Sequence, residues 1–195
     1  MTNIVHAAVA PVSVEPVAND GVVLAGRRLR PGTDVAGLSV FADDAWDLNP
    51  CVFRRNSDGV RLDFSRLAPT FRQTAKEAVL ARLQHRCGPF KPADPHTAAS
   101  LYWALAQLPQ VLAACGAERL DHLDPEALDD WLTTALATQA RSRVRNIVDA
   151  FRFLSLAESH LSGDRLKFIP WGGRGWYQVA ALPGREENRT PRLPE

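Results

Sequence analysis

The sequence predicts a mainly α-helical protein in which a small β element comes before the helices. Apolar residues between positions 66 and 163 recur at the spacing of amphipathic helices in four segments, which prolines and glycines separate. Residues 21–65 contain short strand-like apolar runs instead. Hydrophobic residues make up 46% of the 195-residue chain, which is enough for a buried core.

The part of the chain before the helices divides into an arm and a β element. Residues 1–20 show neither a helical nor a strand period, and we expect them to form a disordered arm. Strand-like runs follow at 22–24 and 38–41. Two further runs, 52–55 and 60–64, flank an Asn-Ser-Asp-Gly sequence whose residues tolerate the positive φ of a tight turn, so we expect a hairpin there.

Two helical segments are expected next. Pro69 suits the first turn of a helix that should end near Gly88. Its expected buried stripe consists of Phe71, Ala75, Ala78, Val79 and Leu83. The second segment runs from about residue 96 to residue 115, where Gly116 suits a C-terminal cap, and Pro109 should kink or divide it.

Two more helices and a tail complete the chain. Asp124-Pro125 is a strong start signal for a third helix. The fourth helix should run from about residue 140 to residue 161, and Gly163 should end it. Residues 66–163 are therefore expected to form a helical domain. In residues 164–195, glycines predict irregular structure, aromatic residues should anchor it on the helices, and an interdomain linker should follow.

The fourth helix is the first candidate for a functional surface. Arg141, Arg145 and Arg152 fall close to one stripe opposite its apolar side, and Arg143 adds charge in the first turn. Such a face could meet a phosphate backbone, with guanidinium groups reaching guanine edges in a major groove. The alternative is an ordinary solvated face, because Asp149 lies four residues after Arg145 and could pair with it.

Other basic residues are weaker candidates. Arg72 and Lys76 are one turn apart on the first helix, and Arg86 and Lys91 follow its end. All four are candidate phosphate contacts, but exposed basic side chains occur on any helix. The basic run Arg27, Arg28 and Arg30 could lie along phosphates or form a soluble turn.

Catalytic and cofactor-binding patterns are missing from the sequence. It has neither a Walker phosphate loop nor a G-x-S-x-G elbow, and its five histidines are scattered. The three cysteines form no C-x-x-C pair at metal-ligand spacing. Charge or proline interrupts every apolar run well before the length of a membrane span, and the N-terminus does not resemble a secretion signal. We therefore expect a cytoplasmic protein without metal or cofactor that is not an enzyme on its own.

The last twelve residues have the composition of a linker. Residues 184–195 combine prolines with charged residues, which disfavours both a strand and a stable helix. We expect this segment to be a linker that leads from a front half into a further domain.

Several short matches together resemble the N-terminal half of actinobacterial-type phage integrases of the tyrosine recombinase family. They are Trp46-Asp47-Leu48, Leu62-Asp63-Phe64-Ser65, the four helices, Pro170-Trp171 and the segment 187–195. The resemblance implies a four-helix SAM-like core-binding bundle, which grips one face of a recombination site while a separate C-terminal domain cuts the DNA.

The sequence departs from the catalytic pattern of that family. No His is followed by Arg at the third position, and the two tyrosines, Tyr102 and Tyr177, do not belong to the nucleophile motif. The first hypothesis is therefore a DNA-binding portion of a site-specific recombinase without the cutting domain. Its partners would be attachment-site duplex DNA and further recombinase protomers. The second is a protein-interaction module, since the net charge of +1 is low for a DNA-binding domain.

Overall fold

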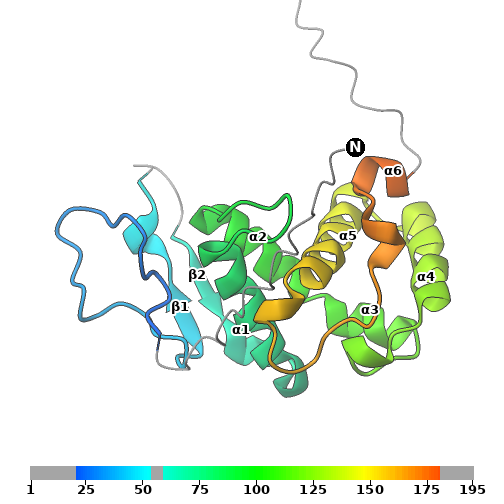
Figure 1. Ribbon diagram of the computed structural model, residues 1–195, viewed down its shortest axis with the longest axis horizontal. Coiled ribbons are helices and arrows are strands. Elements are labelled where there is room, and N and C mark those ends of the chain that lie inside the picture. The colour runs from blue at the N-terminus through cyan, green and yellow to red at the C-terminus, as the bar shows by residue number, and fades with distance from the viewer. Residues whose placement is uncertain (1–20, 54–58, 181–195) are drawn as a thin grey trace, which may run out of the picture.

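A two-stranded antiparallel sheet lies at one end of the molecule (Figure 1). The computed structural model describes residues 21–53 and 59–180. Strand β1 (Ala45–Asp47) pairs with strand β2 (Arg61–Asp63), and Trp46 stands opposite Leu62. The sequence predicted that residues 52–55 would pair with residues 60–64. This prediction is wrong, because residues 52 and 53 lie outside the strands and β1 pairs with β2 instead.

The burial of Trp46 explains why β1, and not the segment 52–55, is the partner of β2. The Trp46 side chain is fully buried, with its ring 5.8 Å from the ring of Phe41 and 4.6 Å from that of Phe64. An aromatic residue with this much apolar surface determines the strand register by packing. The runs at 22–24 and 38–41 meet in one isolated bridge. Residues 54–58, which include most of the expected turn, and the arm, residues 1–20, lie outside the described residues.

Helices make up most of the regular structure in the described chain, which confirms a mainly helical protein with a small β element. They are α1 (Pro69–Gln84), α2 (Pro95–Leu105), α3 (Leu108–Ala114), α4 (Pro125–Thr138), α5 (Arg141–Leu156) and the short α6 (Trp176–Val179). Prolines occupy the first turns of α1, α2 and α4, where the missing N–H costs no hydrogen bond. Among the described helices, none has the length and apolarity needed to cross a membrane.

The expected division at Pro109 is confirmed, because the second predicted segment is split into α2 and α3 just before this residue, which cannot donate a hydrogen bond to the preceding turn. The end of the fourth helix and the structure of the tail differ from the expected ones. Helix α5 ends at Leu156 instead of residue 161, and a 3-10 turn follows. The tail contains α6, which the glycines were expected to prevent; Gly172 and Gly173 lie in the turn before it, and Gly175 is its N-cap.

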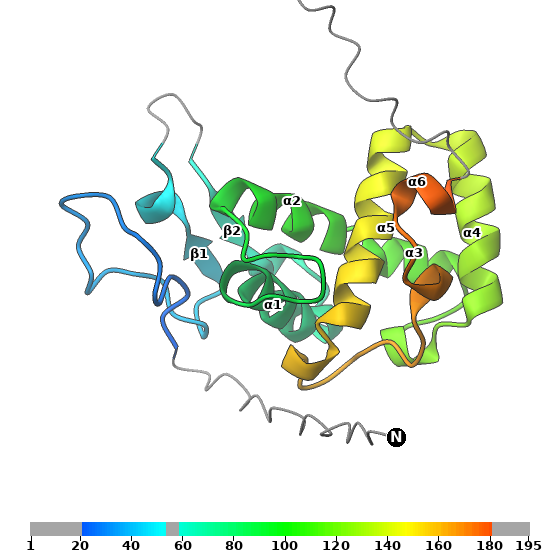
Figure 2. The same ribbon diagram turned by 45° about the horizontal axis from the view of Figure 1, so that its top comes forward.

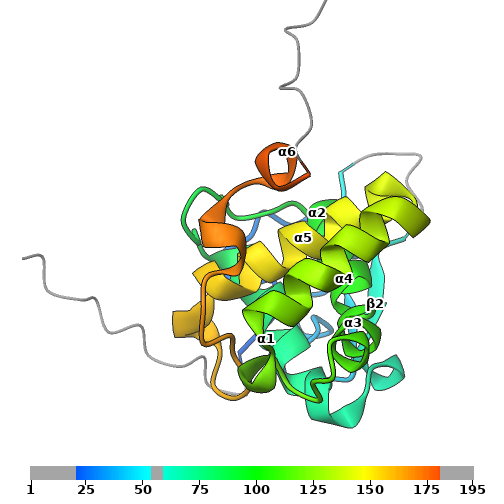
Figure 3. The same ribbon diagram turned by 90° about the vertical axis from the view of Figure 1, so that its right-hand side faces the viewer.

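One apolar core joins the β element to the helices. Buried side chains from Val23 to Leu166 form a continuous cluster, and α2 packs against α1, α5 and β2. The buried Tyr102 hydroxyl donates a hydrogen bond to the Asp63 carbonyl at 2.7 Å. A smaller cluster forms where α4 and α5 lie side by side and Trp176 covers them (Figure 3).

Two polar side chains, those of Asp164 and Arg27, connect distant segments to this core. Asp164, in the segment that returns after α5, is buried and accepts hydrogen bonds from the N–H groups of Leu120 at 2.8 Å and Asp121 at 3.0 Å. Arg27 donates to the Leu83 carbonyl at 3.0 Å and the Ala93 carbonyl at 2.6 Å. Both contacts join residues more than forty positions apart.

Candidate nucleic-acid interface

Helix α5 carries the largest group of predicted site residues. With 3.6 residues per turn, Arg141, Arg145 and Arg152 lie within about 40° of one another around the helix axis. Arg141 and Arg145 are exposed and Arg152 is partly buried. The helix runs between α2 on one side and α6 with its preceding strap, residues 170–175, on the other (Figure 2).

A shallow hollow lies between α5 and α6. We call it the first hollow; its lining residues are Arg141, Ser142, Arg145, Asn146, Asp149 and Trp176. The Arg145 guanidinium lies 5.9 Å from the centre of the Tyr177 ring, and its Nε is 3.6 Å from an Asp149 carboxylate oxygen. The ion pair that the sequence offered as an alternative is therefore present, but Arg141 remains outside it.

The Arg152 side chain lies between the strap and the loop that connects α1 to α2. Its guanidinium lies 5.4 Å from the centre of the Phe90 ring. A Cβ atom placed on Gly175 would lie 3.6 Å from Arg152 Nη1, so the strap passes directly beside this arginine. The neighbouring Arg174 is exposed. Its Nε donates to the Trp171 carbonyl at 2.9 Å, within the strap.

A second hollow lies on the α2 side of α5. Its lining residues are Arg82, Phe90, Thr97, Ser100, Leu101, Asn146, Asp149, Ala150 and Phe153. Arg82 packs on the Phe90 and Phe153 rings and donates to the Lys91 carbonyl, while the Lys91 side chain is exposed. Arg86 is exposed and donates to the Gly88 carbonyl at 3.4 Å.

Four arginines form one surface, which we call the basic face. Arg141 and Arg145 line the first hollow, Arg82 lines the second, and Arg152 lies against Phe90 of the second hollow, so these four arginines are its members. Arg86, Lys91 and Arg174 are exposed but line neither hollow. The Asp149 carboxylate lies among the four arginines, and burial raises its pKa, although Arg145 and Arg152 act in the opposite direction. Asp149 is the one carboxylate among the lining residues of the two hollows.

Arg143 does not belong to the basic face. Its Nε donates to Gln107 Oε1 at 2.6 Å, and it lines a separate hollow with Trp131 and Gln139. The reason is geometrical, because two residues after Arg141 correspond to a rotation of about 200° around the helix.

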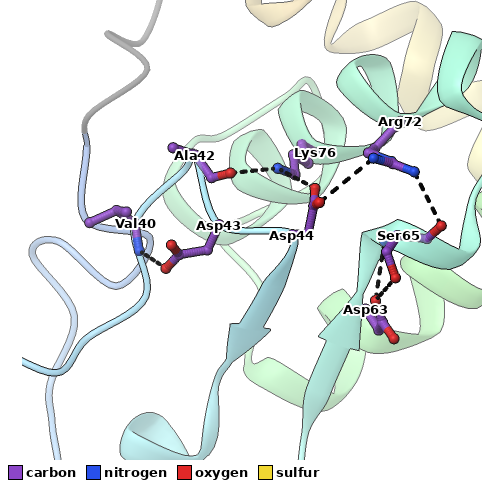
Figure 4. Close-up of polar contacts among 8 residues, drawn as sticks. All are labelled: Val40, Ala42, Asp43, Asp44, Asp63, Ser65, Arg72 and Lys76. Atoms are coloured by element: carbon purple, nitrogen blue, oxygen red, sulfur yellow. Dashed lines mark hydrogen bonds and ion pairs between the residues drawn. The ribbon is translucent and has the colours of Figure 1, made fainter.

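Arg72 and Lys76 lie near the sheet, where both contact the carboxylate of Asp44 (Figure 4). The Lys76 residue is 6% exposed, and its ammonium also donates to the Ala42 carbonyl at 3.2 Å. Arg72 donates to the Ser65 carbonyl at 3.2 Å. Their charges hold the start of β1 on α1, so we leave both residues out of the basic face.

The change Lys76→Met tests this assignment. Methionine keeps most of the apolar volume between the Phe41 and Phe64 rings and removes a charge whose contacts are internal. We expect DNA affinity to change by less than about twofold, because no released counterion depends on Lys76. A titration of labelled duplex by fluorescence anisotropy measures this. A loss of affinity like that of a basic-face variant would return Lys76 to the interface.

Two residues near the basic face were not predicted from the sequence. Arg174 stands in a glycine-rich tail that was expected to be irregular, and Asn146 lines both hollows. The one available signal for Asn146 is its position next to Arg145 on the exposed side of a helix. Within the described residues, no group of three or more His, Cys, Asp or Glu side chains could hold a metal ion. No protein-family model, curated protein or solved structure matches the chain.

Proposed function

We propose that this protein binds double-stranded DNA through the basic face. The observation that carries the proposal is the meeting of arginines from α5 and α1 around two hollows that share Asn146 and Asp149 and are lined by three arginines and one carboxylate. Guanidinium groups suit phosphate oxygens because they donate two parallel hydrogen bonds. The near-neutral net charge of +1 belongs to the whole chain, whereas this face is locally positive.

Within this proposal, the chain is the core-binding, N-terminal portion of a site-specific tyrosine recombinase. The support is the resemblance of the short sequence matches and the helical part that carries the basic face. The two tyrosines have local partners: Tyr102 is buried and donates to the Asp63 carbonyl, and Tyr177 lies against Arg145. The proposed role is therefore to hold DNA, and strand cleavage is left to another domain.

Replacing Arg141, Arg145 and Arg152 together by alanine tests the DNA-binding proposal. We expect affinity for an attachment-site duplex at low salt to fall about 100-fold, because three charge-assisted contacts with the DNA are removed. The slope of log affinity against log salt concentration should decrease by about one for each phosphate contact among them, which is about two to three in total. Gel-shift titrations at several salt concentrations measure both quantities.

A matched control removes the same charge elsewhere. Arg61, Arg66 and Arg165 are exposed arginines outside the basic face. Their triple alanine variant should keep nearly full affinity, and circular dichroism should show that both triple variants are folded. An equal loss in the two variants, or no loss in the first, would contradict the proposal.

A protein-interaction module is the second candidate function. The observation in its favour is Trp103 on α2, whose side chain is 55% exposed. Large exposed aromatic residues are enriched at the centres of protein interfaces. Capture of a protein partner that resists high salt, together with no shift of DNA, would favour this candidate.

A further inference from the structure

The exposed side of α5 forms a ridge. Ser142, Arg145, Asn146 and Asp149 are spaced by three, four and seven positions, which places them on one face of the helix. Asn146 and Asp149 line both hollows, so they stand on the crest between the two depressions.

The dimensions of the ridge match a DNA major groove. An α-helix with its side chains is about 10–12 Å wide, and the major groove is about 12 Å wide. With α5 in the groove, the two phosphate strands would pass over the hollows, where Arg141 lies on one side and Arg82 on the other. The crest from Ser142 to Asp149 is about 10 Å long, or about three base pairs.

Arg145 is oriented for base recognition before any ligand arrives. Its Nε faces Asp149 at 3.6 Å, and its guanidinium lies over the Tyr177 ring at 5.9 Å. Among the residues that the structure describes, its two terminal amino groups make no hydrogen bond, and these are the groups that donate to the O6 and N7 atoms of guanine. Asp149 therefore acts as a positioning residue for Arg145.

The side-chain amide of Asn146 is also available for base recognition. Asn146 is exposed, and among the described residues its side-chain amide makes no hydrogen bond of the kind that fixes other amides, such as Gln107 and Gln84. An asparagine amide can pair in bidentate fashion with the N6 and N7 atoms of adenine. No structural role competes with that use.

We infer that α5 reads DNA sequence in the major groove, with Arg145 selecting guanine and Asn146 selecting an adjacent or nearby adenine. This inference rests on the proposed DNA binding and adds direct base recognition to it. Arg82, Arg141 and Arg152 contact phosphates and carry no base preference. The site read by one protein molecule spans about three base pairs.

Selection from a duplex library with a short randomised segment tests the inference. The wild-type chain should enrich a guanine and an adenine within three base pairs of each other. Asn146→Ala should lose the adenine preference by about tenfold and keep the guanine preference. Asp149→Ala should bind random DNA more tightly, because a negative charge is removed, yet should lose guanine preference. Asp149→Asn keeps an acceptor for Arg145 Nε and should retain that preference.

The control variant is Gln110→Ala, which removes an exposed amide from α3 in a different hollow. Its selected sequences should equal those of the wild type. DNA binding without any base preference, or unchanged preferences in Asn146→Ala, would overturn base reading and leave the proposed function standing. Absence of DNA binding by the wild type would overturn both.

Discussion

Replacing Trp46 by alanine is expected to lower the free energy of unfolding by about 4 kcal/mol, the usual cost of deleting a large buried aromatic side chain. Trp46 is fully buried between the Phe41 and Phe64 rings at the centre of β1. Its loss would leave a cavity where the β element meets the helices. A domain of this size has only about 5–15 kcal/mol of stability in total, so the variant should unfold at a much lower urea concentration.

Trp103→Ala is the matched control for this measurement. The same residue type is changed, but the Trp103 side chain is 55% exposed. Its removal should alter the free energy of unfolding by no more than about 0.5 kcal/mol. Equal losses in the two variants would show that the aromatic cluster around Trp46 does not hold the β element in place.

Replacing Asp164 by alanine is expected to cost about 3 kcal/mol. The Asp164 carboxylate accepts hydrogen bonds from the buried N–H of Leu120 and the part-buried N–H of Asp121, and one oxygen lies 3.9 Å from Arg119 Nη2. Each donor left without a partner costs about 1–3 kcal/mol. Urea denaturation followed by circular dichroism measures the change.

Asp164→Asn separates the charge from the hydrogen bonds. Asparagine retains one acceptor oxygen at nearly the same position, so we expect about half of the loss seen with alanine. Asp130→Ala removes an exposed carboxylate from α4 and should be close to neutral. A stability of Asp164→Ala equal to that of Asp130→Ala would contradict the role of Asp164 as a clamp.

Sequence patterns predicted the helices well because local signals determine their ends. Pro69 and the Asp124-Pro125 pair mark helix starts in the structure as they do in the sequence, and Pro109 divides the second predicted segment as expected. The expected pairing of 52–55 with 60–64 failed because strand partners are chosen by tertiary burial, here that of Trp46. The end of α5 was placed too late because apolar Leu161 continues the helical pattern after the helix itself has stopped.

The candidate site was only partly predictable. The stripe of Arg141, Arg145 and Arg152 follows from helical geometry alone. The position of Lys76 does not, because its partner Asp44 lies thirty-two positions away in sequence. The approach of the strap to Arg152 likewise depends on how the tail folds back. Contacts of this kind are set by packing between elements, which one sequence does not reveal.

The long-range ties have a consequence for the order in which the chain folds during synthesis. The contacts of Arg27 reach as far as Ala93, and the Asp63 carbonyl is paired only when Tyr102 is in place. The N-terminal segment therefore emerges from the ribosome well before the residues that complete its hydrogen bonds. At about 5–20 residues per second, this interval lasts seconds. During that time the aromatic cluster around Trp46 lacks the Tyr102 side chain, whose ring packs on that of Phe64.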